Sequence, residues 1–205
     1  MWLKICGITR EQDARLAADC GADAVGFVFW PGSRRYISAA RAADIAAVLP
    51  AGIEKVGVFV NEPLEHVEAI VREAGLTRVQ LHGDETADMC ALLRVPVVKA
   101  FAVGASFQPA RLDAFGPAVT VLLDADGGDA RGGTGTVLDW AVARRVALAR
   151  ATILAGGLTP DNVADAIREV RPYGVDVASG VEVRPGVKDA GRLQRFVEAL
   201  RRAER

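Results

Sequence analysis

Short apolar runs alternate with longer amphipathic segments along the chain. The runs are rich in Val, Ile, Leu and Phe, and their length and composition are typical of strands that are buried on both faces of a parallel sheet. They occupy residues 2–6, 24–29, 55–60, 78–82, 95–102, 119–125, 151–157 and 173–180.

The segments between these runs are predicted to be helices, because they carry helix-capping and helix-ending residues. We expect Thr9, Ser38 and Asn61 to cap the helices after the first three runs. A further helix is expected to begin near Thr159. Residues 178–189 are expected to lead directly from the eighth strand into the last helix.

Strand-then-helix units of about 25 residues each predict an α/β fold, a (β/α)8 or TIM barrel. No Pro/Ser-rich linker divides the 205 residues, so we expect one catalytic domain over residues 1–205. An open doubly wound sheet has the same local pattern. The barrel is favoured because eight evenly spaced units would make a very wide open sheet.

Composition and charge exclude several classes of protein. The chain is 51% hydrophobic and 25% charged, which predicts a large core and argues against disorder. A net charge of -1 gives no general attraction to nucleic acid or to anionic membranes. No apolar run is long enough to span a bilayer, and the N-terminus has no signal-peptide pattern. We therefore expect neither a nucleic-acid partner nor a membrane partner.

Three widely separated cysteines do not suggest a disulfide framework or a zinc site. A reducing cytoplasm is the simplest compartment for such a chain. Exposed Arg and Glu residues on the last helix argue against a large apolar interface there. A monomer and a homodimer both remain open.

Polar residues and glycines follow the predicted strands at their C-terminal ends. Catalytic groups of parallel barrels come from these strand ends and from the loops after them. We therefore expect a functional site at one rim of the barrel. The residues placed there are Cys6, Arg34, Arg35, Asn61, His82, Asp124, Gly156, Gly157, Ser179 and Gly180.

The alternation of side chains along a strand predicts a buried ion pair below Cys6. In the first strand Leu3 and Ile5 should face the helices, while Lys4 and Cys6 point into the barrel. In the eighth strand Asp176 should point inward. Closure of the barrel makes these strands neighbours. A pair with Asp176 would then compensate the charge of Lys4, which would be costly to bury alone. We expect the ammonium of Lys4 to favour the thiolate, lowering the Cys6 pKa from about 8.5.

The sixth strand places a carboxyl group at the same rim. Thr120, Leu122 and Asp124 share one face, and if it is inward Asp124 lies across the barrel from Cys6. A thiol and a carboxyl group flanking a cavity can act as a base and an acid. The alternatives are that Cys6 is a small buried hydrophobe and that Asp124 caps a turn.

Glycine-containing loops follow the seventh and eighth strands. Glycines expose backbone N–H groups, and loops after these two strands commonly bind phosphate in such barrels. A single Gly-Gly pair is more often only a turn, but two such loops together favour a phosphorylated ligand. The candidate phosphate-binding residues are Gly156, Gly157, Ser179 and Gly180.

The sequence gives no reason to expect a metal or a cofactor. The two histidines, His66 and His82, lie far apart in the sequence. We expect His66 to be solvated on a charged helix. His82 is expected to be either a substrate contact at the rim or a capped turn residue.

Motifs spread over the chain resemble those of the phosphoribosylanthranilate isomerase family, in the family's order. The matching segments are KICGIT (4–9), GADAVGFVFWPGSRRYIS (21–38), VGVFVN (56–61), VQLHGDE (79–85), LLD (122–124), GGTG (132–135), DW (139–140), LAGGLTPDNV (154–163) and VDVASGVE (175–182).

The resemblance implies a barrel enzyme of tryptophan biosynthesis that is an aldose–ketose isomerase. Its reaction is the Amadori rearrangement of N-(5'-phosphoribosyl)anthranilate, which needs no cofactor. The resemblance implies that Cys6 is the general base and that Asp124 is the general acid, protonated because an apolar rim raises its pKa.

The same resemblance assigns substrate contacts. Arg35 would pair with the anthranilate carboxylate, and His82 and Asp176 would be further contacts. Gly157, Ser179 and Gly180 would bind the phosphate, with Gly156 shaping the turn. The chain departs from the family pattern at residues 136–138 and at Ala155, where serine is usual.

Two other functions remain open. Another phosphosugar barrel enzyme would need different groups: Lys4 or Lys99 could point inward as an acid, but no glutamate ends a strand and no His/Asp metal cluster is present. A non-catalytic module that binds phosphometabolites would keep the glycine loops and tolerate loss of Cys6.

Overall fold

Eight parallel strands close into one barrel, with β8 hydrogen-bonded to β1. The structure is a computed structural model that describes residues 1–104, 107–125 and 138–204. The predicted barrel is confirmed, and the open sheet is excluded by the β1–β8 pairing. The strands are β1 (Trp2–Cys6), β2 (Ala24–Val28), β3 (Glu54–Phe59), β4 (Arg78–Leu81), β5 (Val97–Val103), β6 (Thr120–Ala125), β7 (Thr152–Leu154) and β8 (Gly174–Val177).

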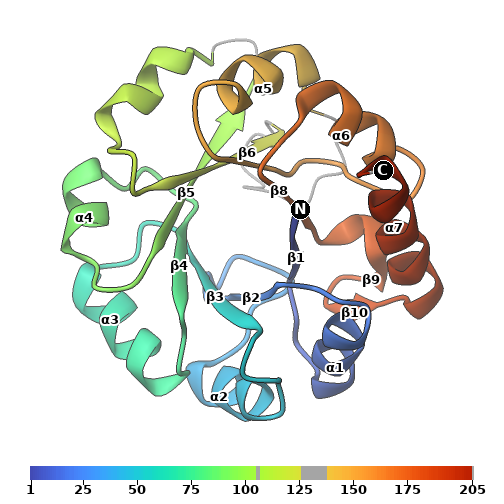
Figure 1. The fold of residues 1–205 in the computed structure, drawn as a ribbon. Coiled ribbons are helices and arrows are strands. Elements are labelled where there is room, and N and C mark those ends of the chain that lie inside the picture. Colours follow the sequence, from blue (N-terminus) through green and yellow to red (C-terminus); the bar gives the residue numbers. More distant parts are fainter. Residues whose placement is uncertain (105–106, 126–137, 205) are drawn as a thin grey trace.

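Helices form a ring around the barrel (Figure 1). None of those in the described ranges has the length and apolar character needed to cross a bilayer. They are α1 (Glu11–Asp19), α2 (Ala39–Ala47), α3 (Leu64–Glu73), α4 (Ala87–Leu92), the 3-10 helix η1 (Pro109–Ala114), α5 (Trp140–Ala147), α6 (Val163–Val170) and α7 (Ala190–Ala203).

The segment after β8 differs from the prediction. A short 3-10 helix, η3 (Ser179–Val181), is followed by an antiparallel ribbon of β9 (Glu182–Arg184) and β10 (Val187–Lys188), and only then by α7. The expected direct passage from strand to helix is therefore wrong. The start of α6 at Val163 is likewise later than expected, because the chain first makes a turn at Thr159–Asn162.

One of the three expected helix caps is confirmed, and two are wrong. The hydroxyl of Ser38 accepts a hydrogen bond from the backbone of α2. The hydroxyl of Thr9 instead donates to the carbonyl of Gly186 at 2.6 Å, and the amide of Asn61 donates to Asp84 at 3.2 Å. Both side chains join loops that are distant in the sequence, so tertiary contacts replace the local caps.

The inside of the barrel holds a small apolar core below the rim. Its buried residues are Val98, Ala100, Leu122, Ile153 and Ala155, with Trp2 packed against them. The outer face of each strand packs against the helices in a much larger core, which includes Leu3, Ile5, Val175 and Val177 as predicted.

Lys99 does not point into the barrel, a placement that the sequence had left open. It lies between inward-facing Val98 and Ala100, and strand alternation turns it outward. Its ammonium donates to the carbonyl of Gly83 at 2.8 Å and pairs with Glu85 at 3.1 Å. Lys99 therefore secures the loop after β4.

The predicted Lys4–Asp176 ion pair is present inside the barrel. The two residues are partners in the β1–β8 register, and Nζ lies 3.0 Å from Oδ2. Lys4 is fully buried. Burial by itself would lower the pKa of Lys4, but the charge of Asp176 and its hydrogen bond raise it above the ordinary value. Lys4 is therefore held in the charged state.

The ion pair predicts a large cost for removing one partner alone. We expect Lys4→Met to lower the free energy of unfolding by about 3–5 kcal/mol, because Asp176 becomes an uncompensated buried charge. The double variant Lys4→Met/Asp176→Asn should recover part of this loss. Urea unfolding measures both effects.

The control is Arg168→Met, which removes an exposed partner of Asp165. Loss of such a surface pair should cost less than about 1 kcal/mol. Equal destabilisation by Lys4→Met and Arg168→Met would contradict the structural importance of the buried pair.

Candidate active site

A cavity of about 650 Å³ opens at the C-terminal ends of the strands. Its volume lies within the range of about 300–1,000 Å³ that is usual for small-molecule sites. Cys6, Arg35, His82, Asp124 and Asp176 all line it. These residues come from five separate parts of the chain, and barrel closure brings them together.

Cys6 ends β1 and lines this cavity. The residue is only 8% exposed and packs with Val28 and Val58, with Trp30 and Ala178 against them. Packing among apolar side chains agrees with the alternative of a buried hydrophobe. The position in the cavity wall nevertheless leaves the thiol open to a ligand.

The expected lowering of the Cys6 pKa is wrong. Burial of the thiol raises its pKa above the ordinary value, and this effect exceeds the opposing effect of Lys4. The negative charge of Asp176 also raises it. Asp176 thus opposes the effect of Lys4, and the neutral thiol is favoured over the thiolate at neutral pH.

Asp124 lies at the end of β6, inward like Leu122, and is 7% exposed. One carboxylate oxygen, Oδ1, accepts from the backbone N–H of Ala125 at 2.9 Å, as a turn-capping aspartate would. The other, Oδ2, lies 3.4 Å from Nε2 of His82. One oxygen therefore fixes the side chain, and the other is available at the rim.

Gln80 was not identified from the sequence. Its amide nitrogen lies 3.0 Å from Nδ1 of His82, so Gln80, His82 and Asp124 form a continuous polar chain. Gln80 is almost fully buried. The signal in the sequence was its spacing of two from His82, which follows β4 directly, so both side chains lie on the cavity side.

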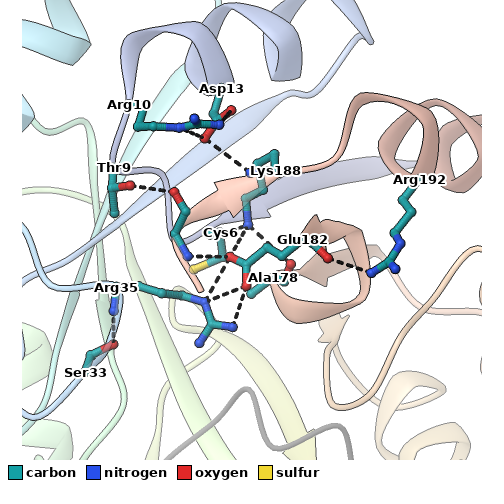
Figure 2. Close-up of polar contacts among 11 residues, drawn as sticks. Cys6, Thr9, Arg10, Asp13, Ser33, Arg35, Ala178, Glu182, Lys188 and Arg192 are labelled. Carbon is teal, nitrogen blue, oxygen red and sulfur yellow. Dashed lines mark hydrogen bonds and ion pairs between the residues drawn. The ribbon is translucent and has the colours of Figure 1, made fainter. Parts of the chain in front are cut away.

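Arg35 is held by a carboxylate that the sequence analysis also missed. Its Nε donates to Oε1 of Glu182 at 3.0 Å and its Nη2 to Oε2 at 2.6 Å. Figure 2 shows this pair beside Cys6, with Lys188 next to Glu182. Arg34, by contrast, is exposed, as expected of a solvated loop residue.

A second cavity, of about 540 Å³, lies between the loops after β7 and β8. It is lined by three of the expected phosphate-binding residues, Gly157, Ser179 and Gly180, and by Arg192 and Arg195 of α7. The two arginines were not predicted, although their spacing of three places both near the start of one helix. Ser179 lines both cavities, which therefore adjoin.

Two glycines shape these loops. A Cβ at Gly180 would lie 1.9 Å from the carbonyl oxygen of Leu158, so the two loops can approach only with glycine there. Gly156 has a φ of +80°, and a Cβ there would lie 2.4 Å from the backbone nitrogen of Ala125. Gly156 does not line the second cavity and supports the turn beside Asp124.

Other expected positions lie apart from the site. His66 is exposed and hydrogen-bonded to Glu62 at 2.8 Å. Within the described ranges, no group of three or more His, Cys, Asp or Glu side chains could hold a metal ion. The GGTG segment and residues 136–137 lie outside the described residues.

Comparison with known proteins finds relatives along almost the whole chain. The family model described as "N-(5'phosphoribosyl)anthranilate (PRA) isomerase" matches residues 3–199. An N-(5'-phosphoribosyl)anthranilate isomerase of Pelobacter propionicus is 47% identical over 200 residues, which are 95% of this chain and 93% of that protein.

Solved structures agree with this relationship. Phosphoribosyl anthranilate isomerase of Thermotoga maritima has a TM-score of 0.91 and 40% identity, with 98% of both chains covered. A phosphoribosyl anthranilate isomerase in complex with reduced 1-(o-carboxyphenylamino)-1-deoxyribulose 5-phosphate has a TM-score of 0.88 and 39% identity, again covering 98% of both chains. Another structure shows monomers generated from the dimeric Thermotoga maritima protein, with a TM-score of 0.87, 39% identity and the same coverage.

The second cavity predicts anion binding that depends on Gly180. We expect Gly180→Ala to weaken binding of inorganic phosphate about tenfold, because the added methyl group pushes the two loops apart and misplaces their N–H donors. Isothermal titration calorimetry measures the affinity.

Gly116→Ala is the matched control, since a Cβ at Gly116 would meet no atom within 4 Å. Phosphate affinity should be unchanged in that variant. Equal affinities in all three proteins would contradict a phosphate site between these loops.

Proposed function

The chain belongs to the N-(5'-phosphoribosyl)anthranilate isomerase family, and from this premise we propose which of its residues perform each step of the reaction. The protein is an isomerase of tryptophan biosynthesis. It converts N-(5'-phosphoribosyl)anthranilate into 1-(2-carboxyphenylamino)-1-deoxyribulose 5-phosphate. The observation that carries the assignment is that Cys6 and Asp124 line one cavity, which adjoins a glycine-lined second one.

The substrate spans both cavities in this proposal. Its phosphate accepts hydrogen bonds from the loops at Gly157, Ser179 and Gly180, where Arg192 and Arg195 add positive charge. Its sugar and anthranilate extend past Ser179 into the larger cavity. This arrangement suits a ligand of the kind bound by the relative that was solved with a reduced product analogue.

Arg35 recognises the anthranilate carboxylate. Glu182 engages Nε and Nη2, which fixes the plane of the guanidinium group in the cavity wall. The far edge of the group remains for a second planar carboxylate, with which arginine pairs through two parallel hydrogen bonds. His82 and Asp176 complete the contacts around the sugar.

The first chemical step is opening of the ribose ring. Asp124, in its protonated form, gives its proton to the ring oxygen while the bond between this oxygen and C1 breaks. The nitrogen lone pair of the anthranilate forms a protonated Schiff base with C1. We assign this proton transfer to Oδ2 of Asp124, the oxygen that lies beside His82 at the rim.

The second step is removal of the proton at C2 by the Cys6 thiolate. The electron pair of the C2–H bond neutralises the Schiff base and leaves an enolamine. Transfer of a proton from the C2 hydroxyl to C1 then yields the ketone. Cys6 is left as a neutral thiol, and the Asp124 carboxylate takes up a proton from solvent, which replaces the proton that Cys6 released to solvent when its thiolate formed. The reaction therefore balances without an external oxidant or reductant.

The raised pKa of Cys6 fits this order of steps. The thiolate is disfavoured before substrate binds, but the cationic Schiff base that forms beside Cys6 stabilises a negative sulfur, so the thiol releases its proton to solvent at this stage. Ring opening by Asp124 therefore prepares the base for proton abstraction.

The assembly and compartment belong to the same proposal. We assign one catalytic domain to residues 1–205, a cytoplasmic location, and a monomeric or homodimeric state. All three cysteines, Cys6, Cys20 and Cys90, are free, which suits a reducing compartment. The dimeric Thermotoga maritima relative and the monomers made from it support either state.

Removal of the base or the acid should slow catalysis strongly and leave the binding of phosphate intact. We expect Cys6→Ala and Asp124→Asn each to lower kcat by about 100-fold to 10,000-fold, the usual contribution of a general acid or base. The loss of phosphoribosylanthranilate fluorescence measures the rate, and calorimetry with inorganic phosphate tests whether the anion site is intact.

Cys90→Ala is the matched control, because it removes a buried thiol from α4. It should keep the activity of the unmodified enzyme. Full activity of both Cys6→Ala and Asp124→Asn would reject the assignment of base and acid. Phosphate binding without any conversion by the unmodified protein would instead support a non-catalytic binding module.

A further inference from the structure

Lys188 places a buried ammonium group against the end of β1. Its Nζ donates to the carbonyl oxygen of Cys6 at 2.5 Å and to that of Ala178 at 3.3 Å. Its side chain is 0% exposed. Cys6 ends β1 and Ala178 directly follows β8, so one ammonium group bonds both sides of the seam that closes the barrel (Figure 2).

Lys188 is held in place by the β9–β10 ribbon. Its backbone N–H donates to Asp13 at 3.3 Å, and Arg10 holds that carboxylate through two hydrogen bonds. Thr9 binds the same ribbon through the carbonyl of Gly186. The ammonium is thus already in position before a ligand binds, so binding loses little entropy in ordering this side chain.

The charge around Lys188 is not fully compensated. Glu182 accepts from Lys188 at 2.9 Å and also pairs with Arg35. Burial by itself would raise the pKa of Glu182, but the hydrogen bonds and charges of Arg35 and Lys188 lower it, so the carboxylate is ionised. Burial lowers the pKa of Lys188 below its usual value, although the charge and hydrogen bond of Glu182 oppose this effect. With Lys188 protonated, one carboxylate faces two cations and the cluster carries one net positive charge.

Lys4 and Asp176 form a separate pair of opposite charges below Cys6. Across the cavity, His82 lies beside Asp124, which is the neutral general acid of the proposed mechanism. The charged and titratable groups around Cys6 are therefore Lys4, Asp176, Arg35, Glu182, Lys188, His82 and Asp124. The cluster of Lys188, Glu182 and Arg35 is the source of uncancelled positive charge among them.

We propose that Lys188 is a positioning residue for Cys6. It fixes the end of β1 in the cavity and, together with Glu182 and Arg35, supplies the positive charge that favours the thiolate during proton abstraction. The inference rests on the proposed role of Cys6 as the base. It adds residues of the β9–β10 ribbon that position Cys6 but do not react with the substrate.

The test compares two variants that change the charge of the cluster in opposite directions. Lys188→Met removes a positive charge and should raise the pKa of Cys6 by about one pH unit, whereas Glu182→Gln removes a negative charge and should lower it by a similar amount. Arg35 stays charged in both variants. The readout is alkylation of Cys6 by iodoacetamide as a function of pH, quantified by peptide mass spectrometry.

Cys20 serves as an internal reference, since it lies at the end of α1 and its pKa is governed by burial and by Asp19 and Arg201. Its alkylation profile should be the same in all variants. Arg78→Met is the matched control for loss of a cation, because Arg78 pairs with Glu54 near the other end of the barrel. It should leave the Cys6 profile unchanged.

Kinetics provide a second readout. We expect Lys188→Met to lower kcat about 100-fold, the cost of misplacing a reacting group by about 1 Å. KM should change less than about threefold, because Lys188 does not line the ligand cavity. Lys188→Arg keeps the charge and the donors and should restore the alkylation midpoint toward that of the unmodified enzyme.

Opposite shifts of the Cys6 profile in the two variants would support the proposal, since a merely structural role would not produce them. Unchanged profiles, or shifts in the same direction, would overturn it. If Lys188→Met does not fold in a thermal-unfolding check, the Glu182→Gln profile decides. Failure of the proposed function itself is distinguishable, because it appears as retained activity in Cys6→Ala.

Discussion

The parallel pairing of β1 with β8 is the contact on which the site depends. Its register places Lys4 opposite Asp176 inside the barrel and leaves Cys6 directly above them at the rim. Only two strands, β7 and β8, then separate β1 from β6. In an open sheet with sequential strand order, Cys6 and Asp124 would be far apart, so closure of the ring creates the shared cavity.

The buried charged side chains discussed above lie beside groups of opposite charge. At one place the numbers of positive and negative groups are unequal. Lys4 with Asp176 and Lys99 with Glu85 are single pairs. Among the residues that the structure describes, Glu182 is a buried carboxylate that pairs with two cations, and it lies near Cys6, the base of the proposed mechanism. Burial disfavours the thiolate in the resting site, so in the proposed mechanism the positive charge of the ribbon and of the developing Schiff base must favour it.

The sequence predicted the features that depend on local or periodic patterns of residues. Buried parallel strands leave apolar runs, and alternation within them identified the inward faces of Lys4, Cys6 and Asp124. Glu182 and Lys188 were missed because they act on residues 147 and 182 positions away, which no periodicity reports. The pKa of Cys6 was misjudged because the effect of Lys4 was considered without the burial of the thiol, which raises its pKa most, and without the opposing charge of Asp176.

The most direct test of the account is a crystal structure of the Asp124→Asn variant with unconverted phosphoribosylanthranilate. The account predicts that Sγ of Cys6 lies about 3–3.5 Å from C2 of the sugar, a near-attack distance. The side chain at position 124 should lie on the other side of the same sugar, beside the ring oxygen. A sulfur atom remote from C2, or both side chains on one side of the ring, would contradict it.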